Sequence, residues 1–559
     1  MFKEVRGNFD KNEICCKRKT KIIPIRKYIF ESDLKRMTVL AKVYSETHQK
    51  NHYIRVLCKG APETIKTLLK EIPEGYDDCY LKWAKEGYRI LALAYKDNEK
   101  YDYNTKREEL EKELIFCGFA IAESPLKHNV EKYIDELIKA NYDVCIITGD
   151  HLLTTLKVSN DLKLGPENFS LLKVEDDKLN WYNIDNTFIK ETKSIEEIKL
   201  LSQEYTLGIT SNEYNNIKAI KNIPNLYEVM QYIKLFCRVS QTQKDEIIKD
   251  LIKSGKSPSM CGDGSNDAGA LKIATIGVAM LNIKENKLQK KEPFNLLSFD
   301  NETTIDNWDA AAVAPFTSKG DSIKCIKNIF VQGRCALVIN LIMYKIFILN
   351  SLITIYFESF LGLKGIKFSD NQSVYIGFAI SMFFLMLSKA KPLNKLNYYR
   401  PPKTIFTLAS FLSIIWQFII YISSITLILY LTREKDPLSI PYDKNTDERF
   451  NPNLINTIMF LFQILNQLII FVVNYQGEPF MQNILQNNFM MKLIFGIIFI
   501  GAVIIFDLYP QLNEGLELVS LPEDNLYKIE IIFIMIINFF ICYMMEKMNN
   551  LFNSKKKAN

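Results

Sequence analysis

The sequence lacks the features that mark secreted, zinc-binding and nucleic-acid-binding proteins. Its eleven cysteines show neither the spacing of zinc ligands nor a disulfide framework, so we expect reduced thiols. The net charge is only +6, and Lys and Arg are mixed with acids instead of gathered in a patch with stacking aromatics, which excludes nucleic acid as a partner. The first twenty residues carry charges throughout and no apolar core, so no signal peptide is predicted.

What the sequence has instead is a change in composition along its length. Charged and amide residues recur every few positions up to about residue 330, whereas long apolar blocks follow residue 336. A chain of 559 residues is also too long for one ordinary domain. We therefore expect a soluble half followed by a membrane half.

Six apolar blocks are long enough to span a bilayer as helices, which takes about twenty residues each. They cover residues 336–363, 371–388, 405–431, 454–474, 493–509 and 529–547. By the positive-inside rule, the basic loop 389–403, the acidic loop 510–526 and the lysine-rich tail predict that the soluble half and the C-terminus face the cytosol. The alternative, buried helices of a soluble protein, does not suit a block such as 493–506, which has no polar side chain.

Polar side chains inside these blocks are candidates for a substrate path, because polar groups in hydrocarbon need partners. The candidates are Lys345, Asn350, Gln417, Gln463, Asn466, Gln467 and Asp507. Spacings of three and four residues place Gln463 on one helix face with Asn466 and Gln467. For each residue alone, hydrogen bonding between helices or snorkelling to the interface is an equal alternative.

In the soluble half, short apolar runs with β propensity alternate with helical patterns, which predicts a parallel α/β sheet. The run 144–147 ends at Thr148-Gly149-Asp150, and the run 257–261 ends at Gly262-Asp263-Gly264-Ser265-Asn266-Asp267. Because ligands bind beyond the carboxyl ends of such strands, both turns are candidate sites.

These turns and Lys244 provide the residue types that phosphoryl transfer needs. Asp263 and Asp267 could hold Mg²⁺, which takes one or two carboxylates plus phosphate oxygens; an ordinary acidic turn is the alternative. Thr148 offers a hydroxyl before a helix N-terminus, and Lys244 could neutralise a transferring phosphoryl group. A nucleophile is missing, since no Asp-Lys-Thr-Gly occurs in the sequence.

Residues 1–116 show a different pattern, with strand-like runs at 38–43 and 53–57 before Lys59-Gly60-Ala61-Pro62-Glu63. A partly apolar pocket with Lys and Arg nearby would suit a nucleotide. The same five residues could also be a turn that leads into a helix.

Together these segments resemble the P-type ATPase family. Lys59–Glu63 is similar to the family's KGAPE motif, Thr148–Asp150 to its TGD motif, and Gly262–Lys272 to its GDGxNDxxALK motif. Further matches to the adenine-site segment, to a nucleotide-contacting arginine and to the RVxxxxK pattern involve Phe30, Lys35, Arg89, Arg238 and Lys244.

Within this family the sequence resembles type V, subtype A, the group of endoplasmic reticulum dislocases of transmembrane helices. The segments that carry this likeness are 314–319, 332–335, 365–370, 388–393 and 473–477. The last three lie in the membrane half, where P-type families diverge most. Lys556 and Lys557 also resemble an endoplasmic reticulum retrieval signal, with a solvated basic tail as the alternative.

The resemblance implies an α/β protein with a multi-span α-helical membrane domain. It implies a partial nucleotide-binding domain (α+β) at 1–116, and a HAD-like Rossmannoid phosphorylation domain lacking its first strand at 117–335. A six-helix transmembrane bundle would follow at 336–559. Residues 165–225 look like a polar insertion in the second domain.

The resemblance also implies ATP and Mg²⁺ as cofactors and assigns roles to residues. The ATP-binding residues would be Phe30, Lys35, Lys59, Gly60, Arg89 and Arg238, with Phe30 stacked on adenine. The catalytic residues would be Thr148, Gly149, Asp150, Lys244, Asp263, Asn266 and Asp267, with Asp263 and Asp267 at the metal and Asp150 helping to close the two domains. The substrate path would contain Lys345, Asn350, Gln463, Asn466 and Gln467.

The implied function is that of an ATP-driven translocase that removes mislocalised transmembrane helices from the endoplasmic reticulum membrane. The alternatives are a pump for cations or polyamines and a non-catalytic membrane subunit that binds nucleotide; the six apolar blocks exclude a soluble phosphatase. The family's phosphorylated Asp, actuator domain and first membrane helices would precede Met1. We therefore expect a fragment that cannot form the phosphoenzyme by itself.

Overall fold

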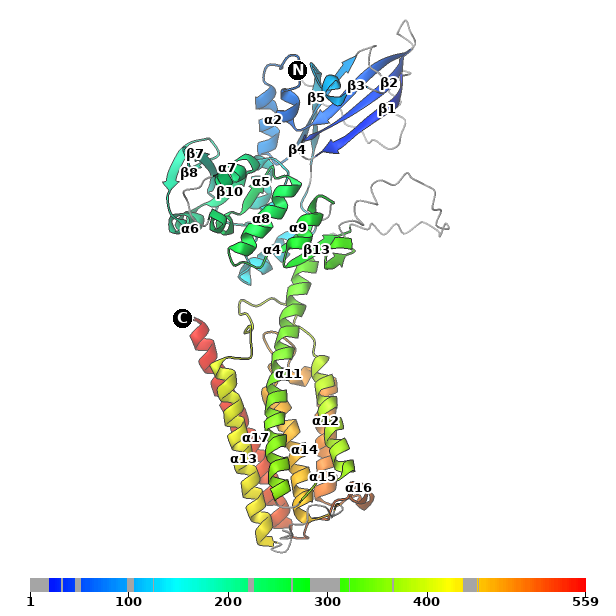
Figure 1. Cartoon of the computed structure of the whole chain (residues 1–559), viewed down its shortest axis with the longest axis vertical. Coiled ribbons are helices and arrows are strands. Elements are labelled where there is room, and N and C mark those ends of the chain that lie inside the picture. Colours follow the sequence, from blue (N-terminus) through cyan, green and yellow to red (C-terminus); the bar gives the residue numbers. More distant parts are fainter. Residues whose placement is uncertain are drawn as a thin grey trace. The chain divides into compact units, whose positions relative to one another are not determined.

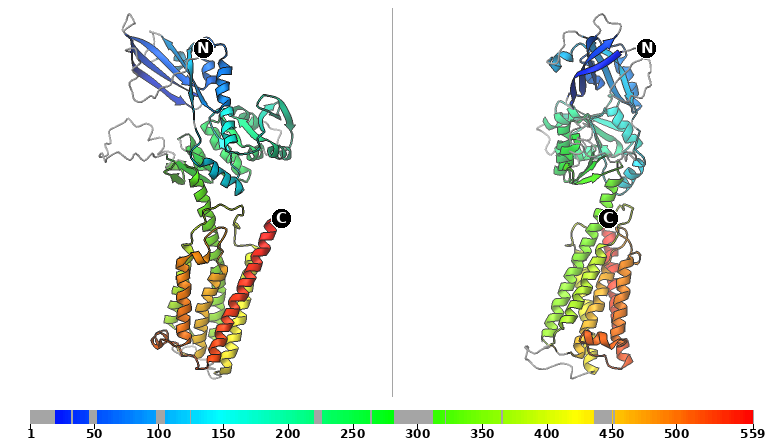
Figure 2. Two further views of the ribbon diagram at one scale, coloured as in Figure 1. Left: turned by 180° about the vertical axis from the view of Figure 1, so that it is seen from behind. Right: turned by 90° about the vertical axis from the view of Figure 1, so that its right-hand side faces the viewer.

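The computed structural model describes residues 20–31, 34–45, 52–97, 105–123, 125–219, 226–262, 265–281, 312–320, 322–363, 366–435, 450 and 452–558 of the chain. The chain divides into two compact units, Met1–Ile326 and Lys327–Asn559. Figures 1 and 2 show sheets flanked by helices in the first unit and long helices in the second.

The first unit begins with a five-stranded antiparallel sheet in the order β1-β2-β3-β4-β5. Its strands are β1 (Thr20–Glu31), β2 (Arg36–Ser45), β3 (His52–Gly60), β4 (Arg89–Asp97) and β5 (Ile115–Ala122), and the connections contain α1 (Pro62–Lys66), α2 (Tyr76–Lys85) and α3 (Arg107–Leu110). Because side chains alternate along a strand, β2, β3 and β4 bury Leu40, Val56 and Ala92 in one core, to which α2 adds Tyr76. This sheet carries the KGAPE-like segment at the end of β3.

Two parallel-stranded layers follow in the same unit, in the orders β6-β11-β10-β7-β8-β9 and β12-β13-β14. The strands are β6 (Ile146–Ile147), β7 (Phe169–Glu175), β8 (Lys178–Tyr182), β9 (Phe188–Thr192), β10 (Thr206–Thr210), β11 (Leu235–Cys237), β12 (Ser259–Gly262), β13 (Ile276–Met280) and β14 (Phe316–Ser318). The helices are α4 (Val130–Lys139), α5 (Leu152–Asp161), α6 (Ile195–Glu204), α7 (Ser211–Ala219), α8 (Gln241–Lys253), α9 (Ala268–Ile273), and the 3₁₀ turns η1 (Leu226–Tyr232) and η2 (Ser265–Asp267). Two pairings in these sheets, β7 with β8 and β8 with β9, are antiparallel. The other pairings are parallel, which confirms the predicted parallel α/β architecture.

One hydrophobic core lies beneath both sheets. Ile209 and Phe236 come from the six-stranded sheet and Met260 and Ala279 from the three-stranded sheet, and all four belong to one buried cluster. Strands β6 and β12 are edge strands of their respective sheets. Both of the predicted site turns therefore follow an edge strand.

The stretch 165–225, which the sequence suggested to be a polar insertion, contributes strands to the six-stranded sheet. These residues form β7 to β10, and β10 lies between β11 and β7 with Leu207 and Ile209 fully buried. Trp181 of β8 is buried as well and donates a hydrogen bond to Thr192 at 2.9 Å. The many Lys and Asn residues of this stretch lie on the outer faces of its strands and helices. Because of them the sequence is polar on average, although apolar residues recur at the buried positions.

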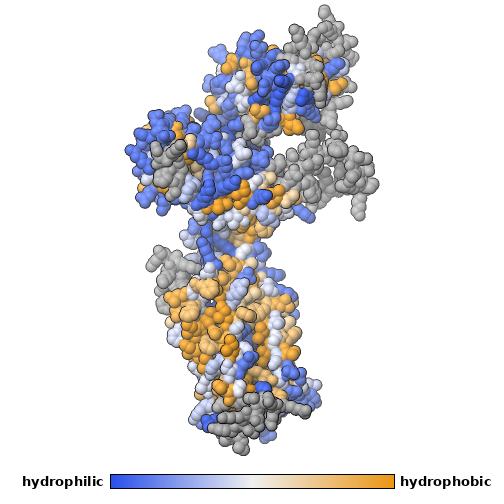
Figure 3. Space-filling model, in the orientation of Figure 1, coloured by the Kyte–Doolittle hydropathy of each residue, from blue (hydrophilic) through white to orange (hydrophobic). Residues whose placement is uncertain are grey.

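The second unit contains six helices that are long and apolar enough to cross a membrane, which confirms the predicted number among the described residues. They are α11 (Lys324–Leu363), α12 (Asp370–Ser388), α13 (Leu408–Lys435), α14 (Leu454–Asn474), α15 (Asn488–Ile505) and α17 (Asn525–Ala558), with the short η3 (Ile484–Gln486) and α16 (Pro510–Gly515) between them. Figure 3 shows that hydrophobic side chains cover much of the outer surface of these helices. Lipid chains would contact that surface.

Helix α14 is the central helix of this bundle. Of its span, 83% is buried, whereas the other five spans are 28% to 44% buried. It contacts α12, α13, α15 and α17. Polar side chains on α14 therefore face protein rather than lipid.

Candidate functional site

The TGD-like turn is held against the neighbouring strand by its backbone. The N–H of Thr148 donates to Phe236 at 2.9 Å, and the N–H of Val239 donates to the Thr148 carbonyl at 3.0 Å. The Thr148 hydroxyl accepts the N–H of Asp150 at 3.1 Å. Helix α5 begins directly afterwards, so its first N–H groups point beyond the carboxyl end of β6, where an anion can be bound.

Lys244 of α8 and Asp267 of η2 form an ion pair. Lys244 Nζ is 2.7 Å from Asp267 Oδ1, and the two side chains are only 14% and 13% exposed. Lys244 is in the first turn of α8, which is fixed by a capping box of Ser240 and Gln243. The structure thus brings together a lysine and one of the two predicted metal-binding carboxylates.

Gly262 allows Asp267 to take this position. A Cβ atom at residue 262 would lie 2.4 Å from Asp267 Oδ2, so any larger residue would displace the carboxylate. Asp263 lies outside the described residues, and Asn266 is exposed. The described residues hold no cluster of three or more His, Cys, Asp or Glu, and a cation here would depend on one or two carboxylates and phosphate oxygens, the arrangement that Mg²⁺ accepts.

The predicted nucleotide-binding residues lie partly together at the ends of β2 and β3. Gly60 pairs with Arg36 across the strands, and Lys59 is exposed one residue earlier. A Cβ at residue 60 would lie 2.8 Å from the carbonyl oxygen of Lys35, so this close approach requires glycine. Phe30 belongs to β1, but its side chain lies outside the described residues.

Two ion pairs connect the first sheet of this unit to the α/β part. Arg89 donates from Nη2 and Nε to Asp150 Oδ1 at 2.5 and 3.0 Å. Arg238 Nη2 lies 2.8 Å from both carboxylate oxygens of Glu63, and His151 Nε2 is 3.4 Å from Glu63. Arg89 and Arg238, both predicted to bind ATP, thus contact acidic side chains of the opposite layer here. Glu63 and His151 were not named as site residues, although Glu63 ends the KGAPE-like segment and His151 directly follows the TGD-like turn.

Burial and the charge of Arg238 shift the pKa values of Glu63 and His151. Burial raises the pKa of Glu63, but the attraction of Arg238 outweighs it and leaves that pKa below its ordinary value. Burial lowers the pKa of His151, and the positive charge of Arg238 acts in the same direction. A neutral His151 also fits the geometry, because its Nδ1 accepts the N–H of Leu153 at 3.2 Å as the cap of α5.

Acidification is expected to loosen this contact through His151. A base whose pKa is lowered in the folded state stabilises the fold above its ordinary pKa, about 6.5, and that stabilisation is lost as the pH falls below this value. His151→Asn keeps a capping side chain without the titration. We expect hydrogen exchange of α5 to accelerate between pH 7 and pH 5.5 in the wild-type chain only. Equal acceleration in the variant would contradict this role of His151.

The membrane unit contains a buried ion pair. Lys345 Nζ of α11 lies 2.8 Å from Glu546 Oε1 of α17, and the side chains are 9% and 7% exposed. Ser413 of α13 donates a hydrogen bond to the same carboxylate, and Gln417 donates to it at 3.3 Å. Gln417 in turn exchanges hydrogen bonds with Asn474 of α14 at 2.8 and 3.1 Å. The sequence prediction included Lys345 but missed Glu546, for which a charge inside an apolar block was the available signal.

Amide side chains continue this polar region within the bundle. Tyr421 donates to Gln463 at 3.1 Å, and Asn538 lies 3.5 Å from Asn466. Neither polar atom of the Asn350 and Gln467 side chains has a hydrogen-bond partner among the described residues, although these side chains are only 7% and 0% exposed. A buried polar group without a partner costs about 1–3 kcal/mol, which indicates a place for water or a ligand group.

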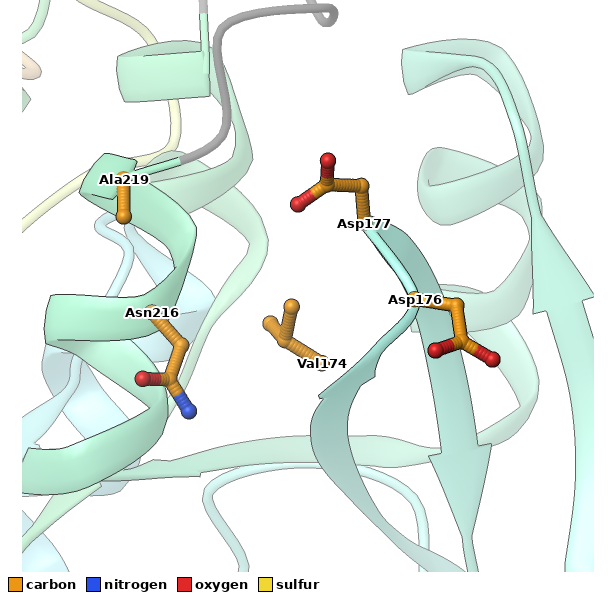
Figure 4. A pocket seen from close by; sticks show the side chains of 5 residues that line it. All are labelled: Val174, Asp176, Asp177, Asn216 and Ala219. Carbon is orange, nitrogen blue, oxygen red and sulfur yellow. The ribbon is translucent and has the colours of Figure 1, made fainter.

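A pocket at the β7–β8 hairpin contains none of the predicted site residues. It is lined by Val174, Asp176, Asp177, Asn216 and Ala219, and Figure 4 shows Asp177 turned toward the hollow. Asp176 and Asp177 have φ angles of 51° and 59°, which a two-residue hairpin turn requires and which Asp tolerates. The turn therefore accounts for these acids without a ligand.

Comparison with known proteins indicates the family of this chain. The model of the P-type ATPase cytoplasmic domain N matches residues 9–129. The endoplasmic reticulum transmembrane helix translocase of Schizosaccharomyces pombe is 30% identical over 95% of this chain and 51% of its own length. The "Probable manganese-transporting ATPase PDR2" of Arabidopsis thaliana is 31% identical over 94% of this chain and 48% of its own length. The human polyamine-transporting ATPase 13A3 is 26% identical over 94% and 44%.

The chain spans about half the length of the curated relatives that it matches. The similarity covers both units, from the antiparallel sheet to the helix bundle. The chain therefore belongs to the P-type ATPase family, in the type V, subtype A branch represented by the endoplasmic reticulum transmembrane helix translocases.

Proposed function

We propose that the chain is the C-terminal part of an ATP-driven translocase of the endoplasmic reticulum membrane whose substrates are mislocalised transmembrane helices. The observation that carries the catalytic part is the buried ion pair of Lys244 in α8 and Asp267 in η2, in the same α/β part as the TGD-like turn. A domain with a purely structural role has no need of such a pair together with a TGD-like turn. This argues against the alternative of a non-catalytic nucleotide-binding subunit.

The residues of this chain would bind ATP and hold its transferring phosphoryl group. Lys35, Lys59 and Arg89 would position the nucleotide by charge. The Thr148 hydroxyl and the first N–H groups of α5 would donate hydrogen bonds to phosphoryl oxygens, and Lys244 would offset their charge. Mg²⁺, held by Asp267 together with Asp263, would neutralise further phosphate charge when bound.

The phosphorylated Asp of the family would have to come from residues other than these 559. Strands β6 and β12 are edges of two sheets that share one core. One further strand between them would complete a continuous parallel sheet, and its carboxyl end would lie beside Thr148 and Asp267. In this proposal the chain holds the phosphoryl group but does not supply the atom that accepts it.

The charges of the membrane unit favour a helix as substrate over a cation. Glu546 is the only buried acid in the described spans, and Lys345 neutralises it. The remaining buried polar groups, such as Asn350 and Gln467, are uncharged. Cations require acids that are not already paired, whereas uncharged amides suit the polar groups of a peptide. The similarity to a probable manganese-transporting ATPase of Arabidopsis thaliana and to a human polyamine-transporting ATPase keeps a manganese or polyamine pump as the second candidate.

The nucleotide site is tested by replacing Lys59 with alanine. We expect the affinity for a fluorescent ATP analogue in the presence of Mg²⁺ to fall about tenfold, the loss of one charge-assisted contact of about 1.4 kcal/mol. Lys85→Ala, at an exposed position of α2, is the matched control and should bind as the wild type does. Equal affinities for both variants would contradict nucleotide binding at the end of β3.

The substrate class is tested with a photo-crosslinking residue at position 350. In proteoliposomes, we expect it to form adducts with a hydrophobic helical peptide and to be unaffected by Mn²⁺ or spermine. Adducts that Mn²⁺ or spermine suppresses would favour the cation or polyamine pump. A crosslinking residue at Phe347, which is 62% exposed on α11, reports contact from the lipid side.

A further inference from the structure

Two lysines flank an aromatic ring at one end of the helix bundle. Lys389 directly follows α12, and its Nζ lies 5.4 Å from the centre of the Phe489 ring in the first turn of α15. Lys492 comes three residues after Phe489, so it lies on the same face of α15. All three side chains are exposed. The end of α12 and the start of α15 therefore present two positive charges beside one ring.

The loop between α12 and α13 continues this basic surface and is held in place by its backbone. Arg334 of α11 donates a hydrogen bond to the Asn397 carbonyl, and the Lys391 carbonyl accepts the N–H of Gln482 at 2.9 Å. Residues 389–407 contain five basic residues and no acid. These five exposed side chains are Lys389, Lys391, Lys395, Arg400 and Lys403.

Charge distinguishes this end of the bundle from the other. The loop 475–487, which leads from α14 to α15 at the same end, adds one acid, Glu478. The dipoles of α12, which ends here, and of α15, which begins here, oppose each other, so the lysines set the sign of the potential. The loop 510–526 at the opposite end has four acids and no base. An anionic group is therefore attracted to the end where α12 meets α15.

Apolar side chains continue from each lysine along the outer surface of its helix. On α12, Leu385 is exposed four residues before Lys389. On α15, Phe495 and Phe499 are exposed three and seven residues after Lys492. The two helices contact each other and lie side by side in Figures 1 and 2. Two adjacent apolar surfaces with lysines at one end match the shape of a phospholipid with a negative headgroup.

We propose that the junction of α12 and α15 is a binding site for an anionic phospholipid, with phosphatidylinositol as the type of lipid. Lys389 and Lys492 contact the headgroup phosphate, because their long stems carry the ammonium groups from the helix surface to the headgroup level. Lys391 and Lys395 of the ordered loop add to the attraction, as basic residues beside a bilayer do. The acyl chains lie along the exposed apolar side chains of both helices.

Native mass spectrometry of the full chain in a neutral detergent tests the headgroup contacts. We expect tighter binding of phosphatidylinositol than of phosphatidylcholine. Lys389→Gln combined with Lys492→Gln should weaken the binding of phosphatidylinositol about thirtyfold, the effect of two lysines near a charged lipid surface. The same variant should bind phosphatidylcholine as the wild type does, which shows that it is folded.

The matched control removes two charges at the other end of the bundle. Arg433 is exposed near the end of α13, and Lys528 is partly exposed in the first turn of α17. Arg433→Gln combined with Lys528→Gln should leave the affinity for phosphatidylinositol unchanged. Equal weakening by both double variants, or equal affinity of the wild-type chain for the two lipids, would overturn the proposal.

Photolabelling tests the position of the acyl chains. A phosphatidylinositol with a diazirine on one acyl chain is added to the chain in nanodiscs of phosphatidylcholine. We expect labels at residues 378–385 and 495–499, and few in the double lysine variant. Glycerophosphoinositol and inorganic phosphate, which lack acyl chains, should not compete. Competition by either, or labelling of the exposed residues 411–419 of α13 to the same extent, would show that no phospholipid is bound specifically here.

Discussion

Replacing Lys345 with methionine is expected to destabilise the membrane bundle by about 3–5 kcal/mol, the cost of leaving a buried charge without its partner. The Glu546 carboxylate would stay 7% exposed with no counter-ion. Ser413 and Gln417 would still donate hydrogen bonds to it, but neither carries a charge. The expected result is a large loss of folded, monodisperse protein after heating in detergent, measured by size-exclusion chromatography.

Two further variants separate the ion pair from general effects of the substitution. Lys492→Met removes an exposed lysine of α15 and should leave the stability close to that of the wild type. Lys345→Met combined with Glu546→Leu removes both charges and should recover most of the loss, since an apolar pair of similar volume often replaces a buried ion pair. Equal stability of Lys345→Met and Lys492→Met would show that the charge of Glu546 is not balanced by Lys345.

The number of membrane helices could be predicted because the signal is local. A block of about twenty apolar residues specifies a span without reference to any other part of the chain. The partner of Lys345 could not be predicted in this way, because Glu546 lies 201 residues further along. Helix periodicity gives the face that a residue occupies but not the helix that covers it.

The first unit, Met1–Ile326, shows the same contrast between local features, which the sequence predicts, and long-range contacts, which it does not. The turns after β6 and β12 were predicted, because each combines a short apolar strand with glycine and Asp at its end. The contact of Arg238 with Glu63 bridges 175 residues, and no local pattern indicates it. The central position of β10 was missed for another reason: it is a five-residue strand within a Lys- and Asn-rich stretch, and composition outweighed its short apolar run.

Replacing Lys244 with alanine is expected to reduce ATP-dependent phosphate release about 10²–10³-fold, the usual effect of removing one preorganised group that stabilises transition-state charge. The Lys244 side chain is 14% exposed and its Nζ lies 2.7 Å from Asp267 Oδ1, so its charge is little screened by water. The measurement is the initial rate of Mg²⁺-dependent phosphate release in membranes that contain the chain together with the residues that supply the family's phosphorylated Asp.

Lys249→Ala is the matched control, because Lys249 is exposed on the same helix α8 and should leave the rate unchanged. Loss of the Lys244 charge also leaves Asp267 unpaired, so the melting temperature is measured for both variants. A low rate with a melting temperature near that of the wild type assigns Lys244 to the chemistry. Equal rates for the two variants would make the pair with Asp267 structural, and the non-catalytic subunit would then be the better account of this chain.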